Sequence, residues 1–243
     1  MEIIKVRDYE ELSQKASSYI LSKVKQIESP VLGLATGSTP EGLYSQLVDE
    51  YKKGNISYKN VTTFNLDEYT NIDSTDPNSY HFFMNKHLLG HIDIPKTQIN
   101  LPNGSVQDLE AECLEYDEKI TRAGKIDLQI LGIGVNGHIG FNEPGTPFTS
   151  RTHIVTLDES TREANSRFFS SIDEVPTHAI TMGIGTIMES KEILLLVSGE
   201  QKADTLNRLL NGEVSEDFPA SILHNHSKVT VIADAAACSK LAE

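Results

Sequence analysis

The sequence predicts an α/β protein with an open, mostly parallel, doubly wound (Rossmann-like) sheet that carries helices on both faces. Short runs rich in Val, Ile and Leu alternate along the chain with segments whose apolar residues recur every three or four positions. The 243 residues suffice to bury one sizeable core, and no linker rich in Pro, Gly or Ser divides them. We therefore expect a single domain over residues 1–243.

The first half of the chain alternates expected strands and helices. We expect strands at residues 3–6, 31–35, 61–66 and 128–133, each a short apolar run. Helices are expected at about residues 12–27, 40–53 and 106–120, because one face of each is apolar. Thr39 and Pro40 predict the N-cap and first position of the second helix, and Gly54 ends it. The run 128–133 is the expected central strand.

The second half continues the same alternation. Strands are expected at residues 154–157, 179–182, 193–197 and 229–233, and a helix at 201–210 that Gly212 closes. Ligands of such sheets bind outside the carboxyl ends of the strands. The residues that follow each strand are therefore the first place to look for a site.

Charge and composition exclude several classes of function. The chain has 35 acids against 21 Lys and Arg, a net charge of −14 with no segregated basic face, so we expect no nucleic-acid partner. No segment resembles a signal peptide or is long and apolar enough to cross a bilayer, so we expect a cytoplasmic protein with no membrane partner. Cys113 and Cys238, far apart in the chain, suit a reducing compartment.

A loop of small residues follows the second expected strand. Thr36, Gly37, Ser38 and Thr39 lead into a helix whose first amides are unpaired and whose dipole favours an anion. One interpretation is a phosphate site, and the other is an ordinary capped turn. It is not a Walker loop, because no Gly-Lys-Ser/Thr follows.

Two basic residues stand out in so acidic a chain. Lys202 falls in the first turn of the helix expected at 201–210, where a cation opposes the helix dipole unless an anion lies nearby. Arg167 lies among apolar neighbours. Each is either an anion ligand or a solvated surface residue.

Two adjacent acids follow the third expected strand. Side chains alternate along extended backbone, so only one of Asp67 and Glu68 can face a ligand. A carboxylate there is a base for a carbon acid or half of a metal site, or else a helix cap or solvated acid. Metal is the weaker alternative, because the closely spaced histidines have no Cys or general-base Glu at a recognised spacing. These pairs are His87 with His91 and His224 with His226.

The loop after the expected central strand has the composition of a catalytic loop. Residues 132–145 contain five glycines, a histidine, a glutamate and two asparagines. His138 and Glu143 form a candidate proton-transfer pair, unless His138 is a structural histidine bonded to backbone. The glycine spacing matches the dinucleotide-binding GxGxxG motif, but Pro144 prevents the helix that the motif requires.

Five ordered motifs resemble those of the glucosamine-6-phosphate deaminases, in the glucosamine/galactosamine-6-phosphate isomerase family. They span most of the chain, at residues 34–40, 65–69, 137–144, 164–169 and 201–203. The related 6-phosphogluconolactonases share the fold and the phosphate loop, but the second and third motifs are typical of deaminases.

The resemblance implies conversion of glucosamine 6-phosphate and water to fructose 6-phosphate and ammonia, with no metal or organic cofactor. Asp67 would move the C2 proton to C1, and His138, oriented by Glu143 and Asn136, would open the sugar ring. Many relatives carry Asp at position 136, and an amide cannot accept a proton, so Asn136 would only orient. The implied substrate and phosphate ligands are Thr36, Gly37, Ser38, Thr39, Gly137, Arg167 and Lys202.

Two alternatives remain at this point, a lactonase and a non-catalytic sugar-phosphate sensor. A lactonase needs no C2 base, and a sensor needs a DNA-binding partner domain. Hexameric relatives are activated by N-acetylglucosamine 6-phosphate through small hydroxyl residues and cations that are here replaced by Gly145, His153 and Val155 among others. We expect no such activation, and a monomer or small homo-oligomer.

Overall fold

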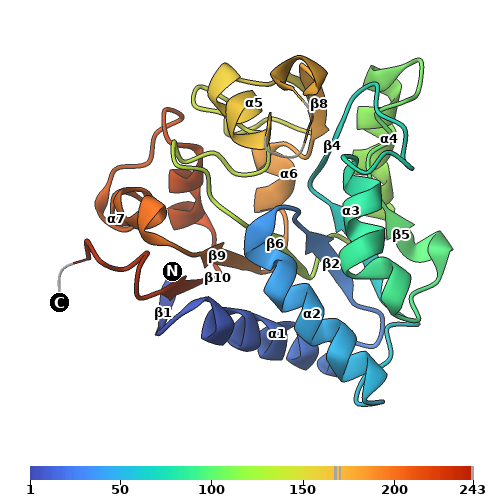
Figure 1. Cartoon of the computed structure of the whole chain (residues 1–243), viewed down its shortest axis with the longest axis horizontal. Helices are drawn as coiled ribbons and strands as arrows, with labels where there is room; N and C mark the ends of the chain where they lie inside the picture. Colours follow the sequence, from blue (N-terminus) through green and yellow to red (C-terminus); the bar gives the residue numbers. More distant parts are fainter. Residues whose placement is uncertain (167–168, 170, 242–243) are drawn as a thin grey trace.

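The computed structural model of the protein describes residues 1–166, 169 and 171–241. Its main element is a parallel seven-stranded sheet in the order β1-β10-β9-β6-β2-β3-β5, which confirms the predicted class and places β6 in the middle (Figure 1). The strands are β1 (Glu2–Val6), β2 (Val31–Leu34), β3 (Thr62–Asn65), β5 (Ile99–Asn100), β6 (Leu128–Leu131), β9 (Ile193–Val197) and β10 (Val229–Asp234).

Helices flank the sheet on both faces, with α1 and α2 lying side by side (Figure 1). The α-helices are α1 (Tyr9–Gln26), α2 (Ser38–Lys52), α3 (Tyr80–His87), α4 (Leu109–Arg122), α5 (Glu159–Asn165), α6 (Ile184–Met188) and α7 (Ala203–Asn211). Short 3-10 helices are η1 (Leu89–His91), η2 (Lys96–Gln98), η4 (Ile172–Glu174), η5 (Glu200–Lys202) and η6 (Pro219–Asn225). None of the helices in the described ranges is long and apolar enough to cross a membrane.

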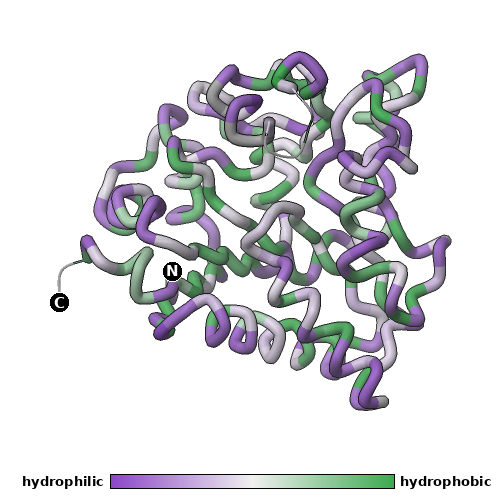
Figure 2. Tube along the Cα trace, viewed as in Figure 1, coloured by the Kyte–Doolittle hydropathy of each residue, from purple (hydrophilic) through white to green (hydrophobic). Residues whose placement is uncertain are grey.

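The core lies along the central strands. Every residue of β2, β6, β9 and β10 is buried, as the near-continuous apolar runs of a doubly covered sheet require. Figure 2 shows the hydrophobic residues concentrated along these strands, with polar residues on the outer helix faces. The strand ends that carry polar loops therefore extend from the most deeply buried part of the molecule.

The expected strands at 154–157 and 179–182 do not join the main sheet. They form β7 (His153–Thr156) and β8 (His178–Thr181), which pair antiparallel with each other. Strand β8 also pairs antiparallel with β4 (Asp67–Tyr69), so the three strands make a separate sheet. The residues of β7 are only partly buried, which an antiparallel sheet with one open face tolerates. Apolar periodicity could not separate the two sheets, because both contain short apolar runs.

Two further boundaries correct the sequence prediction. The expected third strand, 61–66, stops at Asn65, and Leu66 links the two sheets by donating to Leu34 at 3.0 Å and accepting from Met182 at 2.7 Å. Helix α2 begins at Ser38 with Gly37 as its N-cap, so Thr39 lies inside the first turn and is not the cap.

Candidate active site

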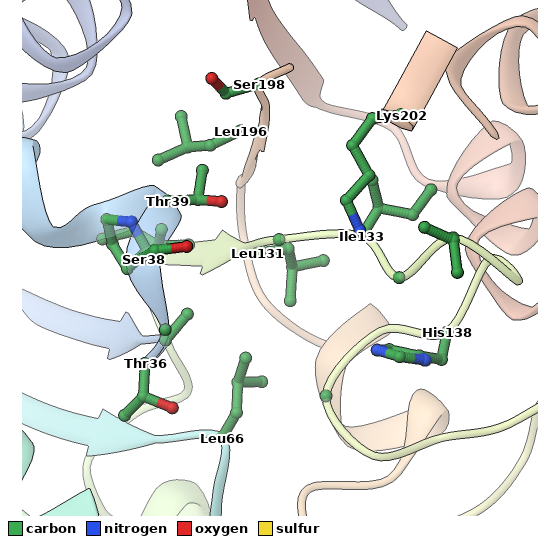
Figure 3. A pocket seen from close by; sticks show the side chains of 18 of the residues that line it. Thr36, Ser38, Thr39, Leu66, Leu131, Ile133, His138, Leu196, Ser198 and Lys202 are labelled. Carbon is green, nitrogen blue, oxygen red and sulfur yellow. The ribbon is translucent and has the colours of Figure 1, made fainter. Parts of the chain in front are cut away.

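A cavity of about 910 Å³ opens at the carboxyl ends of β2, β6 and β9, where the sequence predicts the site (Figure 3). Its walls come from the loops after these three strands and from β4 of the second sheet. The predicted site residues on its surface are Thr36, Gly37, Ser38, Thr39, Asp67, Asn136, His138 and Lys202. The fold thus brings together side chains that lie up to 166 positions apart in the sequence.

One wall of the cavity is the first turn of α2. Gly37 has a φ of +92°, a conformation that glycine adopts without the strain that other residues incur. No side chain caps this helix, so the first amides remain available to a ligand that carries negative charge. Figure 3 shows Ser38 and Thr39 on this wall and Lys202 on the opposite wall.

Lys202 is a cation inside the cleft. Burial lowers the pKa of its ammonium, and within the described part of the chain no acidic side chain pairs with it. Lys202 lies in η5, immediately before α7 and not in its first turn as predicted. Lys202 is half-buried, and a partly desolvated ammonium without a partner is favoured by an anion in the space before it.

The turn that precedes Lys202 is held by Asp234 at the end of β10. The Asp234 carboxylate accepts the Gly199 amide at 3.1 Å and the Ser198 hydroxyl. It also accepts the Ala237 amide at 2.8 Å. Asp234 is buried, and its sequence context gives no sign of this role, because the contact joins segments 35 residues apart.

Asp67 presents a buried carboxylate to the cleft. The residue is 7% exposed, and within the described residues no hydrogen bond reaches its side chain. Burial raises the pKa of Asp67 to about 8, with a further contribution from the charge of Glu68. A carboxylate in this environment is a much stronger base than one in water.

Glu68 points away from the cleft, as the alternation along extended backbone requires. Its carboxylate accepts the amides of Tyr80 and His81 at 3.0 Å each, and so caps the N-terminus of α3. It also accepts from the His81 ring at 2.8 Å. Of the two roles that the sequence allows, Asp67 is the cleft carboxylate and Glu68 is the helix cap.

His138 and Glu143 face each other in the loop after β6. Nδ1 of His138 lies 3.4 Å from Oε2 of Glu143. Glu143 also accepts from the Asn136 amide at 2.7 Å and from the Thr161 hydroxyl at 2.6 Å. Burial raises the pKa of Glu143, but the contacts with His138, Thr161 and Asn136 outweigh burial and lower it to about 2. Glu143 is therefore a carboxylate at neutral pH.

Two glycines give this loop its shape. A Cβ on Gly134 would lie 2.4 Å from Nδ1 of His138, so only glycine lets the imidazole lie over the loop. Gly137 has a φ of +89°, and a Cβ there would overlap the ring of Phe218. Gly137 does not line the cavity, and its conformation shapes the loop that carries His138.

Among the predicted residues, Gly137 and Glu143 do not line the cavity. Arg167 lies outside the described residues. No cluster of three or more potential metal ligands occurs among the residues that the structure describes. Instead, the rings of His91, His224 and His226 each bond to a backbone carbonyl oxygen, at 2.8, 2.6 and 2.8 Å. These are structural histidines.

The sequence prediction missed several cleft residues. Thr161 of α5 lines the cavity and bonds to Glu143, 18 positions earlier in the chain. Tyr80 and Phe141 form an aromatic wall, with their rings stacked at a centroid distance of 6.2 Å. Phe141 lies within the 137–144 motif but is not among its predicted site residues. Thr161 and Tyr80 belong to no motif, because each reaches the cleft through a contact between distant segments.

Comparison with known proteins agrees with this geometry. Residues 7–232 match the family described as glucosamine-6-phosphate isomerases/6-phosphogluconolactonase. A glucosamine-6-phosphate deaminase of Oceanobacillus iheyensis is 59% identical over 237 residues, covering 98% of this chain and 95% of the relative. The solved structure of a monomeric glucosamine-6-phosphate deaminase is 55% identical with a TM-score of 0.97, covering 98% of this chain and 99% of the other.

A more distant similarity is to 6-phosphogluconolactonase from Trypanosoma brucei. Its TM-score is 0.79 at 19% identity, with 99% of this chain and 98% of the other covered. This similarity shows a shared fold alone.

Proposed function

Because the chain belongs to the family of glucosamine-6-phosphate isomerases and 6-phosphogluconolactonases, we propose how its cleft turns glucosamine 6-phosphate and water into fructose 6-phosphate and ammonia. The protein is a glucosamine-6-phosphate deaminase, which is an enzyme of sugar-phosphate metabolism. The observation that carries the mechanism is the placement of Asp67 and Lys202 in one cavity, a buried base and a half-buried cation.

The phosphate of the substrate binds between two walls of the cavity, the first turn of α2 and the wall that carries Lys202. The free amides of the α2 first turn, at Gly37, Ser38 and Thr39, face it from one side, and the Lys202 ammonium faces it from the other. An anion here relieves the cost of partly burying Lys202 without a partner. Arg167 is a further phosphate ligand in this proposal, on the basis of its motif. Binding the phosphate holds the sugar carbons at a fixed place in the cleft.

His138 opens the pyranose ring. It takes the proton of the C1 hydroxyl and delivers a proton to the ring oxygen, which yields the open-chain aldehyde. The Glu143 carboxylate stabilises the imidazolium that forms between these steps, and Asn136 holds Glu143 in place. The ring must open first, because the aldehyde at C1 is what makes the C2 proton acidic.

Asp67 then transfers a proton from C2 to C1. As Asp67 removes the C2 proton, the C1 oxygen takes a proton from the substrate's own ammonium group. This leaves a neutral enolamine, with a hydroxyl on C1, a double bond between C1 and C2 and the amine on C2. The protonated Asp67 returns the proton to C1, which leaves an iminium at C2. Water adds to this carbon and ammonia leaves, so that C2 becomes the ketone of fructose 6-phosphate. The raised pKa of Asp67 suits a group that must both accept and return a proton.

The direct test is to incubate the protein with glucosamine 6-phosphate and to assay both ammonia and fructose 6-phosphate. We expect the two products in equal amounts. A matched incubation with 6-phosphogluconolactone tests the lactonase alternative, which requires hydrolysis of an ester and no ammonia. Acid release from the lactone without ammonia from the amino sugar would overturn the proposal.

The assembly and place of action are also part of this proposal. A relative with 55% identity over nearly the whole chain is described as monomeric, which supports a monomer or small homo-oligomer here. The substrate carries a charged phosphate that does not cross a membrane unaided, which supports action in the cytoplasm. Light scattering on the purified protein would measure the mass of the assembly.

A further inference from the structure

Tyr9, the first residue of α1, reaches across to the first turn of α2. Its hydroxyl donates to the Ser38 carbonyl oxygen at 2.9 Å and accepts the Gly42 amide at 2.8 Å. In a regular α-helix the amide of Gly42 would donate to the carbonyl oxygen of Ser38, four positions earlier. The Tyr9 hydroxyl thus bridges the turn that forms one wall of the cleft, and Tyr9 itself lines the cavity.

Gly42 makes this close approach of the two helices feasible. A Cβ at this position would lie 2.4 Å from Oγ of Ser13 and 3.1 Å from Cε1 of Tyr9. The Ser13 hydroxyl donates in turn to the Tyr9 carbonyl oxygen at 2.9 Å. The contact between α1 and α2 is therefore built from a small residue on one helix and two hydrogen-bonding residues on the other.

The turn has no side-chain cap of its own. Its N-cap, Gly37, has no side chain that could accept one of the first amides, so a contact from another helix can fix the turn. We propose that Tyr9 is the positioning residue of the phosphate-binding turn. It fixes the direction of the free amides at Ser38 and Thr39, and so sets the affinity of the cleft for phosphate. This inference rests on the phosphate position given under Proposed function.

The expected effect is on binding and not on turnover. Tyr9 lies at the phosphate end of the cleft, whereas the proton transfers are carried by Asp67 and His138. The phosphate does not react, so its contacts stabilise the bound substrate and the transition state equally. Loss of such contacts raises KM and leaves kcat unchanged.

The test compares Tyr9→Phe with Tyr19→Phe. Tyr19 is on the same helix and its hydroxyl also bonds, to Glu192 and Thr230, but it does not line the cavity. We expect Tyr9→Phe to weaken binding of inorganic phosphate, measured by calorimetry, by about three- to tenfold, the effect of one hydrogen bond. The KM for glucosamine 6-phosphate rises by the same factor, and kcat stays within about twofold. Tyr19→Phe changes neither constant.

The possible outcomes separate the role of Tyr9 from the phosphate position on which that role depends. Unchanged phosphate affinity in Tyr9→Phe, or an equal loss in Tyr19→Phe, would overturn the role of Tyr9 and leave the proposed function intact. A wild-type protein that forms ammonia but binds no phosphate would instead show that the phosphate position is wrong, and the inference with it. Gly42→Ala, which forces the helices apart but keeps the hydroxyl, provides a second variant with the same expected rise in KM.

Discussion

The side-chain amide of Asn136 donates to the carboxylate of Glu143 at 2.7 Å. The same side chain accepts the backbone amide of His138 through its oxygen at 3.2 Å. Asn136 therefore ties both members of the proton-transfer pair together while carrying no charge. Glu143 is left as the one carboxylate facing His138 in this loop.

We expect Asn136→Asp to raise the pKa of the Glu143 carboxyl. The substitution places a second carboxylate within hydrogen-bonding distance of Glu143, and two carboxylates this close share a proton instead of both ionising. The apparent pKa of the pair then lies well above the value of about 2 for Glu143 alone. The measurement is the carboxyl carbon NMR shift of Glu143 against pH, and superimposable titration curves for the two proteins would contradict the assignment.

Asp67→Asn should abolish proton transfer while preserving phosphate binding. An amide cannot act as the base, and positioned bases contribute about 10²- to 10⁴-fold to rate, so kcat falls by that factor. Exchange of the C2 proton with deuterated solvent, followed by NMR, isolates this step. Inorganic phosphate should bind to the variant as to the wild type. Undiminished exchange would assign the base elsewhere.

The same substitution should stabilise the fold at high pH. The pKa of Asp67 is about 8 in the folded protein but about 4 in an unfolded chain, so the folded state holds a proton that the unfolded state has lost between these values. Stability therefore falls as pH rises through this window, and the whole cost is present above about pH 8. The rise in Tm caused by Asp67→Asn should be small near pH 4 and largest near pH 8. Asp204→Asn, at an exposed acid, is the control.

Lys202→Ala should weaken binding of the phosphorylated substrate. A charge-assisted contact to phosphate contributes about 1.5–3 kcal/mol, which corresponds to roughly ten- to hundredfold in kcat/KM. Lys240→Ala removes the same charge from a surface ion pair with Asp204 and serves as the matched control. Steady-state kinetics measures kcat/KM for both variants. Equal kcat/KM values for Lys202→Ala and Lys240→Ala would place the phosphate away from Lys202.

Turnover should follow simple saturation and should not respond to N-acetylglucosamine 6-phosphate. The positions where activated relatives are expected to hold cations carry His153 and Val155 here. Arg151, the nearest arginine, pairs with Asp117 at 3.4 Å and with Glu189 at 3.1 Å. Without differential contacts to an effector there is no coupling free energy. Initial rates with and without the N-acetylated sugar phosphate test this, and a sigmoidal curve made hyperbolic by it would contradict the prediction.

The parts of the site predicted from sequence share one property: each follows a strand directly. Gly37 after β2, Asp67 after β3 and His138 after β6 are recognisable because parallel strands end at one edge of the sheet. Their meeting in one cavity follows from the fold class. Sequence patterning could therefore place these three residues at one edge of the sheet.

The supporting contacts could not be found this way. Tyr9 and Gly42 are 33 positions apart, and Ser198 and Asp234 are 36 apart. Neither pair belongs to a motif, since each depends on how two elements pack. The second sheet was missed for the same reason, because strand partners are a tertiary property.

The pairing of β1 with β10 has a consequence for how the protein is made. The two strands are in register from Glu2 opposite Thr230 to Val6 opposite Asp234. Roughly 230 residues of chain must close into a loop for this pairing, which makes it a slow, late step. During translation, β1 leaves the ribosome before β10 and has no β10 partner until residue 234 has emerged. Because Asp234 holds the Gly199 turn, the nascent chain completes its cleft only then.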